Sequence, residues 1–396
     1  MGSTNDIFES ITNGANKEMT AKEYNEKTDN TAALGDLMAH IELMKQGVEV
    51  WKTGFPKLDK ALGGGFHADE LIFLGAVSSL GKTNFALQIA TNIAESGKDV
   101  LIFSLEMSKN ALNARTISRY THIQTVGTDK EKYRLKTRDI LNGEVGDLMQ
   151  GQPLDTQSQV FREAFNAAGR IADRVRIFIG ESDVDVDTIK QAVASHIKTT
   201  GNKPFVIVDY LQILQASENA KTSEKRLLTD YDVTQLKVIA RDFGIPVLAI
   251  SAFNRASYLE PVSTSSFRES SGIEYSSDVL LALQFQGMDY QKHYFTTKNS
   301  KRRLVYESEK IHKSRVRDLW DKIQKDKRDG LALPIELKAL KTREDAGDNV
   351  YFSFLPAYSY YEEQEKSSYK YDPSEWEDVD EIETPFSDKG VSLGEM

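Results

Sequence analysis

The sequence predicts an α/β domain built on a mostly parallel central sheet. From Trp51 onward, short apolar runs alternate with longer stretches of helical periodicity, a pattern typical of strands that are joined through helices. Strands that read as nearly continuous apolar runs suit a parallel sheet covered by helices on both faces. The predicted strands are Leu71–Gly75, Val100–Ser104, Arg176–Ile179, Phe205–Asp209, Pro246–Ser251 and Asp278–Gln284.

Two further strands are expected to end the sheet. The segments about Ile335–Lys341 and Val350–Phe354 flank a polar turn that contains Gly347, which predicts a C-terminal β-hairpin at the sheet edge. Residues 120–170 are expected to be helical, and residues 286–330 to form a basic helical insertion. All of these elements belong to one large domain over residues 51–361.

Both ends of the chain differ from this domain. Residues 1–50 begin with a polar stretch that is expected to be mobile. Between Ala32 and Gln46 the apolar side chains recur at helical spacing, which predicts one amphipathic helix. That helix would pack either on its own domain or on a neighbouring subunit. Residues 362–396 are acidic, poor in aliphatic side chains and without periodicity, so a disordered tail is expected there.

Composition limits the chemistry that the chain can carry. Its 396 residues include no cysteine, which excludes disulfides, Cys-ligated zinc, iron–sulfur clusters and thiol catalysis. No apolar run approaches the roughly 20 residues that span a bilayer, and the polar N-terminus lacks the apolar core of a signal peptide. The chain is therefore expected to be cytoplasmic, with no membrane partner.

The acidic charge is concentrated at the two ends. Of the formal net charge of -10, residues 1–50 carry -5 and residues 362–396 carry -9, which leaves +4 for residues 51–361. Within that body, residues 291–330 hold 13 basic and 6 acidic side chains. This segment is either a solvated, charge-rich insertion or a basic surface for a polyanion. The net charge therefore does not exclude nucleic-acid binding.

A phosphate-binding loop is predicted directly after the first strand. The strand runs through Gly75 into Ala76-Val-Ser-Ser-Leu-Gly-Lys82-Thr83, and an apolar helix follows. Backbone N–H groups at such a helix N-terminus cradle phosphates, the lysine reaches the β- and γ-phosphates, and the Thr83 hydroxyl would bind Mg²⁺. The strict motif has glycine where this chain has Ala76, but the strand–loop–helix context outweighs that difference. The candidate nucleotide-binding residues are Ser78, Ser79, Leu80, Gly81, Lys82 and Thr83.

Two carboxylates follow other predicted strands. Glu106 comes soon after the strand that ends at Ser104, and Asp209 ends the strand that begins at Phe205. The carboxyl ends of parallel strands meet at one edge of a sheet, so both acids are expected to lie near Lys82. Asp209 fits a Mg²⁺ ligand, and Glu106 fits the base that activates the attacking water. The alternative for each acid is a purely structural role as the cap of a following helix.

Taken together, these motifs resemble the RecA-like motor domain of the DnaB family of replicative ring helicases. The resemblance covers roughly residues 32–361. It rests on the segment Thr53–Asp59 with Gly63–Gly65, the Gly-Lys-Thr loop, Phe103–Ser108 with Arg115, Asp209–Gln212, Phe267–Glu274 and the pair Lys341 and Arg343. In this chain Ala252 stands where the family has glutamine, and its side chain cannot hydrogen-bond a γ-phosphate.

The resemblance implies a homo-oligomeric ring, a hexamer, that hydrolyses ATP with Mg²⁺ and moves 5′-to-3′ on single-stranded DNA. Lys341 and Arg343 would reach into the neighbouring subunit's site and stabilise charge on the γ-phosphate. Arg268, Glu269, Ser271 and Gly272 match the loop that contacts DNA in the central channel. The family's large N-terminal domain has no counterpart in the first 50 residues, where only a linker helix is expected. A loader or primase is a further expected partner.

Three functions remain open from the sequence. The leading one is a DNA helicase or translocase of a phage, plasmid or mobile element. The second is a RecA-like or KaiC-like ATPase without unwinding activity, such as a recombination mediator or regulator, for which Ala252 argues. The third is a non-enzymatic ring component that binds a replication protein through Trp376 and Phe386 of its acidic tail. A forked-duplex unwinding assay separates the first two.

Overall fold

The computed structural model describes residues 49–77, 80–145, 155–180, 184–217, 220, 224–254, 258–267, 270–296, 302–343 and 349–370. The expected N-terminal helix and residues 371–396 of the expected acidic tail lie outside these ranges. In the described part of the chain, no helix is both long enough and apolar enough to cross a membrane.

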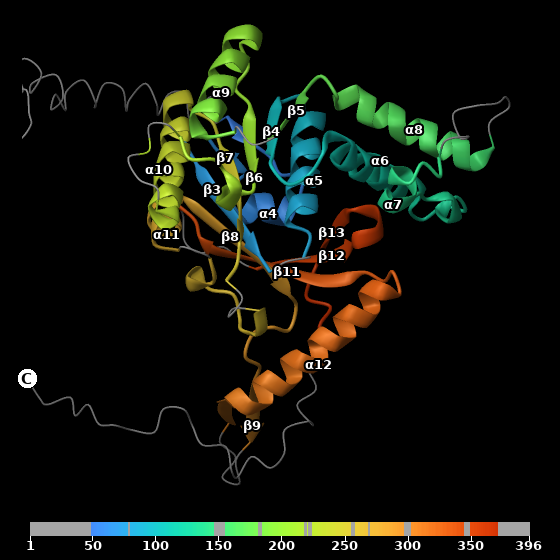
Figure 1. Cartoon of the computed structure of the whole chain (residues 1–396). Helices are drawn as coiled ribbons and strands as arrows, with labels where there is room; N and C mark the ends of the chain where they lie inside the picture. The colour runs from blue at the N-terminus through green and yellow to red at the C-terminus, as the bar shows by residue number, and fades with distance from the viewer. Residues whose placement is uncertain are drawn as a thin grey trace, which may run out of the picture. The chain divides into compact units, whose positions relative to one another are not determined.

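A nine-stranded mixed sheet forms the centre of the domain, in the order β13-β12-β11-β8-β3-β7-β6-β4-β5 (Figure 1). Six neighbouring strands are parallel, as the apolar runs predict. They are β3 (Leu71–Ala76), β4 (Val100–Ser104), β5 (Val175–Ile179), β6 (Phe205–Asp209), β7 (Val247–Ala252) and β8 (Val279–Phe285). Each predicted strand is present, with small shifts at its ends.

Helices cover both faces of this sheet, which is why β3, β4, β6 and β8 are buried along their whole length. One face carries α5 (Lys82–Glu95), α6 (Lys109–Thr125), α7 (Thr137–Leu141) and α8 (Thr156–Ile171) (Figure 1). The other face carries α9 (Val186–Thr200) and α10 (Lys225–Phe243), and α11 (Ser270–Ser276) packs on α10. The side chains of Ser108, Asp155 and Asp185 accept hydrogen bonds at the N-termini of α6, α8 and α9. A short antiparallel pair, β1 (Val50–Trp51) and β2 (Phe66–His67), flanks α4 (Pro56–Ala61).

The C-terminal hairpin is confirmed, but it does not end the sheet. Antiparallel β11 (Leu333–Lys341) and β12 (Val350–Leu355) continue into β13 (Tyr360–Gln364), which is the edge strand. The predicted domain end at residue 361 therefore falls inside a strand. Tyr361 of β13 is fully buried, stacks on Phe354 at a ring distance of 4.2 Å and donates its hydroxyl to the Leu80 carbonyl. The last strand thus supports the predicted phosphate loop from behind.

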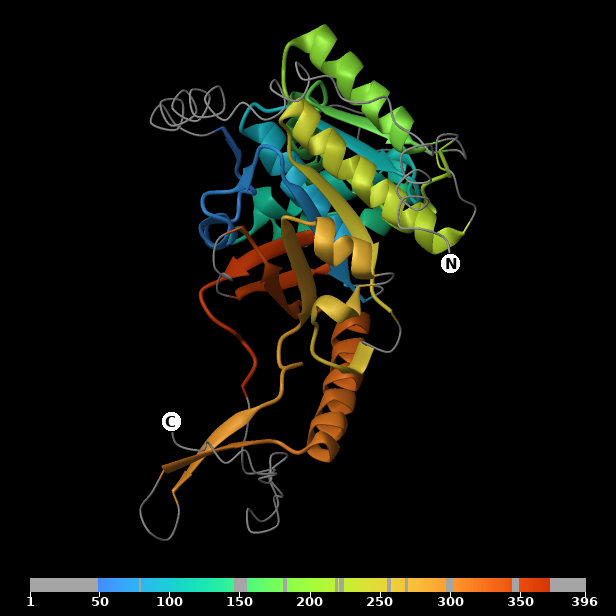
Figure 2. The same cartoon turned by 90° about the vertical axis from the view of Figure 1, so that its left-hand side faces the viewer.

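The insertion at residues 286–330 is only partly helical, whereas the sequence predicts a helical segment. Its first half is an antiparallel hairpin of β9 (Lys292–Thr296) and β10 (Arg302–Tyr306), and only its second half is a helix, α12 (Glu309–Arg328). Aromatic and branched residues, such as those at 294–296 and 304–306, favour strands over helix despite the basic charge. Figure 2 shows the hairpin extending away from the central sheet beside α12.

A buried ion pair fixes this insertion. The Arg315 guanidinium donates to Glu307 Oε1 at 2.6 Å and to the Asp289 carbonyl at 2.9 Å. Glu307 is fully buried in its side chain and also contacts His312. Burial raises the pKa of Glu307, but hydrogen bonds from Arg315, Gln291 and His312 outweigh it and hold that pKa below its ordinary value.

Candidate active site

The loop after β3 ends in a left-handed glycine that starts α5. Gly81 has φ 86°, and α5 begins at the next residue, Lys82. A Cβ at Gly81 would lie 2.7 Å from the Phe354 ring and from the Tyr361 hydroxyl oxygen. Glycine is therefore required both by the backbone conformation and by the aromatic side chains behind it.

Gly75, one residue before the position of the motif glycine, is required by its own neighbours. A Cβ at Gly75 would lie 2.2 Å from Phe253 Cε1 and 2.5 Å from Phe267 Cε1. Both rings are 2% exposed, and they meet edge-to-face at a centroid distance of 5.0 Å. The glycine thus admits two aromatic rings against β3, while Ala76 is buried in the strand.

Lys82 points back over its own loop. Its Nζ donates to the Ala76 carbonyl at 3.1 Å. Burial lowers the pKa of the Lys82 ammonium, and the carboxylates of Asp209 and Glu106 oppose that shift. Lys82 therefore bonds the last residue of β3, with two acids near enough to act on its charge.

Thr83 and Asp209 form the centre of the site. The Thr83 hydroxyl donates to Asp209 Oδ2 at 2.8 Å. Burial raises the pKa of Asp209 to about 6; the Glu106 charge adds to that rise, whereas the hydrogen bond from Thr83 opposes it. The pair presents a hydroxyl and a carboxylate, the oxygen ligands that Mg²⁺ prefers.

One cavity of about 400 Å³ collects these groups at the carboxyl ends of the strands. Gly81, Lys82, Thr83, Glu106 and Asp209 line it, and Ser104 pairs with Asp209 in adjacent parallel strands. Glu106 is exposed, in the loop between β4 and α6. The structure therefore brings together the lysine, the hydroxyl and both carboxylates that the sequence singles out.

Apart from Ala252, four other residues line this cavity without having been predicted as site residues: Met107, Arg115, Tyr210 and Tyr258. Arg115 hydrogen-bonds Asn84 of α5, and burial lowers its pKa, against the charges of Asp209 and Glu106. Its sequence signal was its place beside the Phe103–Ser108 segment among the motifs that carry the family resemblance. No sequence signal pointed to Tyr258. Ala252 also lines the cavity, at the end of β7.

The candidate DNA-contacting residues are only partly described. Arg268 and Glu269, like Ser78 and Ser79 of the phosphate loop, lie outside the described residues. Ser271 and Gly272 belong to α11, and a Cβ at Gly272 would lie 2.1 Å from Asp230 Oδ1. Gly272 therefore allows α11 to pack closely on α10.

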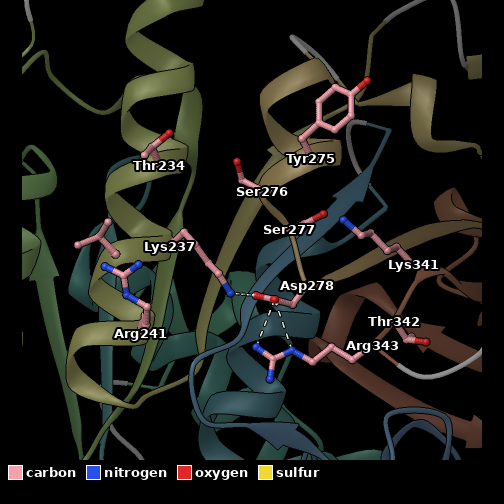
Figure 3. A pocket seen from close by; sticks show the side chains of 11 residues that line it. Thr234, Lys237, Arg241, Tyr275, Ser276, Ser277, Asp278, Lys341, Thr342 and Arg343 are labelled. Carbon is pink, nitrogen blue, oxygen red and sulfur yellow. Dashed lines mark hydrogen bonds and ion pairs between the residues drawn. The ribbon is translucent and has the colours of Figure 1, made fainter. Parts of the chain in front are cut away.

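Lys341 and Arg343 lie in a different cavity, of about 480 Å³ (Figure 3). The two cavities share no lining residue. Arg343 hydrogen-bonds Asp278, at the start of β8, and lies 3.8 Å from Glu70 Oε1, just before β3. The six residues of β3 separate Glu70 from the phosphate loop, a distance of roughly 20 Å along the strand. Arg343 thus lies at the amino ends of the parallel strands.

Comparison with known proteins gives a consistent family. A family model described as the DnaB-like helicase C terminal domain matches residues 50–362. Similar proteins include a probable replicative DNA helicase of Guillardia theta, 30% identical over 246 residues that make up 61% of this chain and 36% of that protein. The replicative DNA helicase DnaB of Pasteurella multocida is 29% identical over 270 residues, 65% of this chain and 52% of that protein. This chain spans 36% to 59% of the length of the first relatives it matches.

Solved structures share the fold. One that is described as an ATPase domain superposes with a TM-score of 0.61 at 20% identity, covering 84% of this chain and 97% of that one. A DnaB-like replicative helicase, described with its interactions with primase, gives a TM-score of 0.60 at 19% identity over 86% of this chain and 72% of that chain.

Proposed function

The chain belongs to the DnaB-like helicase C terminal domain family, and from this membership we propose that it is the ATP-driven motor of a replicative DNA helicase. The observation that carries the proposal is the gathering of Lys82, Thr83, Glu106 and Asp209 around one cavity beside a helix N-terminus. Such an arrangement binds a triphosphate and places a carboxylate beside it. The relatives supply the nucleic-acid substrate, since their names describe replicative DNA helicases.

The side chains around the cavity would have different roles in ATP hydrolysis. Lys82 would leave the Ala76 carbonyl and bond the β- and γ-phosphate oxygens, where its charge offsets the charge of the transition state. Glu106 would orient the attacking water and accept its proton. Arg115 would add positive charge at the same cavity.

Thr83 and Asp209 would hold Mg²⁺. The donor set fits, because a hydroxyl and a carboxylate oxygen already lie 2.8 Å apart beside the loop. When bound, the ion would neutralise charge on the phosphate oxygens.

The position of Arg343 supports a shared active site. Neither Arg343 nor Lys341 lines the cavity of Lys82 in the same chain. In a ring of identical subunits, the surface with Arg343 of one subunit faces a different surface of the next. We infer that Lys341 and Arg343 act on the nucleotide of a neighbouring subunit in a homo-oligomeric ring. The family resemblance implies that this ring is a hexamer.

The proposed DNA contacts and partners rest on the family resemblance. Arg268, Glu269, Ser271 and Gly272 would face single-stranded DNA in the channel, with movement 5′-to-3′. A primase or loader would be a partner, and a phage, plasmid or other mobile element would be the origin. The chain would act in the cytoplasm, where such elements replicate.

A forked-duplex assay tests this function. The purified chain, with ATP and Mg²⁺, should separate a labelled fork that carries a 5′ single-stranded arm. Lys82→Ala should abolish both ATP hydrolysis and strand separation with the fold retained, while Lys198→Ala, an exposed lysine of α9, should change neither.

Ala252 supports the competing assignment, since it lines the nucleotide cavity without a polar side chain. ATP hydrolysis that requires Lys82 but separates no fork, at any salt concentration, would instead identify a RecA-like or KaiC-like ATPase without unwinding activity. No hydrolysis at all would contradict both readings.

A further inference from the structure

Arg343 is held along one edge of its guanidinium. Its Nε and Nη2 donate to Asp278 Oδ1 at 3.4 and 3.2 Å, and Nη2 also donates to the Asp69 carbonyl at 3.1 Å. The two Nη1 hydrogens have no acceptor among the described residues. Figure 3 shows this third nitrogen on the side of the guanidinium that faces away from Asp278. The side chain is 46% exposed, so that edge can reach another molecule.

Asp278 is itself fixed from the other side. Its Oδ2 accepts the Leu71 N–H at 2.8 Å and a hydrogen bond from Lys237 Nζ, and Lys237 also donates to the Asp69 carbonyl at 3.0 Å. The carboxylate is only 16% exposed. Burial raises its pKa, but the Leu71 N–H, Lys237 and Arg343 outweigh burial and hold that pKa below its ordinary value. Asp278 is therefore an ionised, rigid acceptor at the start of β8.

The other charged groups of this cavity do not compete with Asp278 for Arg343. Lys341 Nζ donates to the Glu274 carbonyl at 2.8 Å, and Arg241 pairs with Asp242 on its own helix. Glu70 is the only other carboxylate among the described residues that lies within 4 Å of Arg343. It is 3.8 Å from Nε and already accepts the His67 N–H.

We propose that Asp278 is a positioning residue for Arg343: it fixes the Nε–Nη2 edge so that Nη1 is presented to a phosphate oxygen of the neighbouring subunit's nucleotide. This inference rests on the proposed function, in which Arg343 acts between subunits. A guanidinium suits the task because it is planar and has five N–H donors, so it can bond a carboxylate and a phosphate at the same time. An ammonium has no fixed second edge.

Asp278→Asn tests the inference, because it keeps the shape of the side chain and removes its charge. We expect kcat for ATP to fall about tenfold with the KM within about twofold of wild type, since the lost contact acts in the transition state. Arg241→Ala, in the same cavity but bonded within its own helix, should leave both constants unchanged. Unchanged or increased kcat in Asp278→Asn would overturn the inference; an increase would show that Asp278 restrains Arg343 instead.

A double-mutant cycle separates positioning from a general structural role. In an Arg343→Ala background, Asp278→Asn should lower the residual hydrolysis rate, measured in single turnover at high enzyme concentration, no further, whereas a merely structural Asp278 would lower it again. If Arg343→Ala itself leaves hydrolysis intact, the proposed shared site fails; if it abolishes hydrolysis while Asp278→Asn leaves kcat unchanged, only the present inference fails.

Arg343→Lys keeps the inference testable if Asp278→Asn does not fold. Lysine retains the charge but cannot bond Asp278 and a phosphate along two edges. We expect a loss of kcat close to that of Arg343→Ala. Near wild-type hydrolysis by Arg343→Lys would show that the two-edged arrangement is not needed.

Discussion

The size of one residue, Gly75, sets how the phosphate loop meets the rest of the domain. Phe253 follows β7 and Phe267 precedes the predicted DNA-contacting residues, and both rings pack where a side chain at position 75 would lie. The end of β3 therefore touches the segment that leads to that loop. A substitution at Gly75 should therefore disturb both the phosphate loop and the segment that leads to the predicted DNA-contacting residues.

Gly75→Ala should destabilise the protein by about 1–3 kcal/mol, because a new methyl group would overlap two buried rings. It should also lower the kcat for ATP, since crowding at Gly75 would shift the end of β3, from which the phosphate loop starts. Denaturant unfolding and steady-state ATPase measurements test this. Gly169→Ala is the control: it lies in α8, and a Cβ there would meet nothing within 4 Å. Equal stability of the two variants would contradict the steric argument.

Asp232 of α10 gives a prediction for pH. Burial and, secondarily, the Asp185 charge raise its pKa to about 7, from an ordinary 3.8. The folded protein then binds a proton at Asp232 that the unfolded chain has lost. Asp232 therefore contributes stability that falls as pH rises from about 4 to about 7, and that contribution stays level above that.

Asp232→Asn should remove this slope, with a gain of about 1–3 kcal/mol near pH 8 and little gain near pH 4. Unfolding free energies measured across that range would show it. Asp321→Asn, on the exposed face of α12, should leave the slope in place. A gain that does not depend on pH would mean that the Asp232 charge is not its source.

At the scale of elements, what the sequence predicts follows from local pattern. Strands such as β4 and β6 are apolar runs with clear ends, and the rule that parallel strands end together brings Asp209 near Lys82. β13 was missed because Tyr-Tyr-Glu-Glu-Gln is short and polar, and because its pairing with β12 and the burial of Tyr361 are not visible in a local pattern. The hairpin β9–β10 was missed because its segment is rich in basic residues and was predicted to be helical. The packing of Phe253 and Phe267 on Gly75 joins residues far apart in sequence, which no local pattern records.

The insertion reaches the nucleotide cavity through one aromatic residue of α12. Trp320 Nε1 donates to the Tyr258 carbonyl at 3.1 Å, and its ring meets Phe285 edge-on at 5.2 Å. Tyr258 lines the cavity of Lys82. The helix therefore braces a wall of the candidate active site.

Trp320→Phe should keep the ring packing and lose the hydrogen bond. We expect a stability loss of about 1 kcal/mol and a KM for ATP raised about two- to fivefold, with kcat little changed, because a looser Tyr258 weakens binding in ground and transition state alike. Lys322→Ala, exposed on the same helix, is the matched control. An unchanged KM in Trp320→Phe would show that α12 does not support the cavity.

At the scale of the whole molecule, the two cavities lie at opposite ends of the parallel strands. A subunit that carries its nucleotide beside Lys82 cannot bring its own Arg343 to it. Arg343 lies beside Glu70, and the whole length of β3 separates Glu70 from the phosphate loop. Completion of the site by a second copy is therefore a geometric requirement of the proposed mechanism, and it predicts how defective subunits should behave when mixed.

Lys82→Ala and Arg343→Ala should each lose hydrolysis alone and partly restore it together. In a mixed ring, an Arg343→Ala subunit offers an intact Lys82 cavity, and a Lys82→Ala neighbour offers an intact Arg343. If subunits mix at random in equal amounts and interfaces act independently, about a quarter of the interfaces contain both intact groups. ATPase activity should approach that fraction of wild type, and rise with the time allowed for subunit exchange. Lys82→Ala mixed with the double variant Lys82→Ala/Arg343→Ala is the control, because no interface is then complete. Mixed rings verified by mass that show no activity above this control would exclude a site shared between subunits.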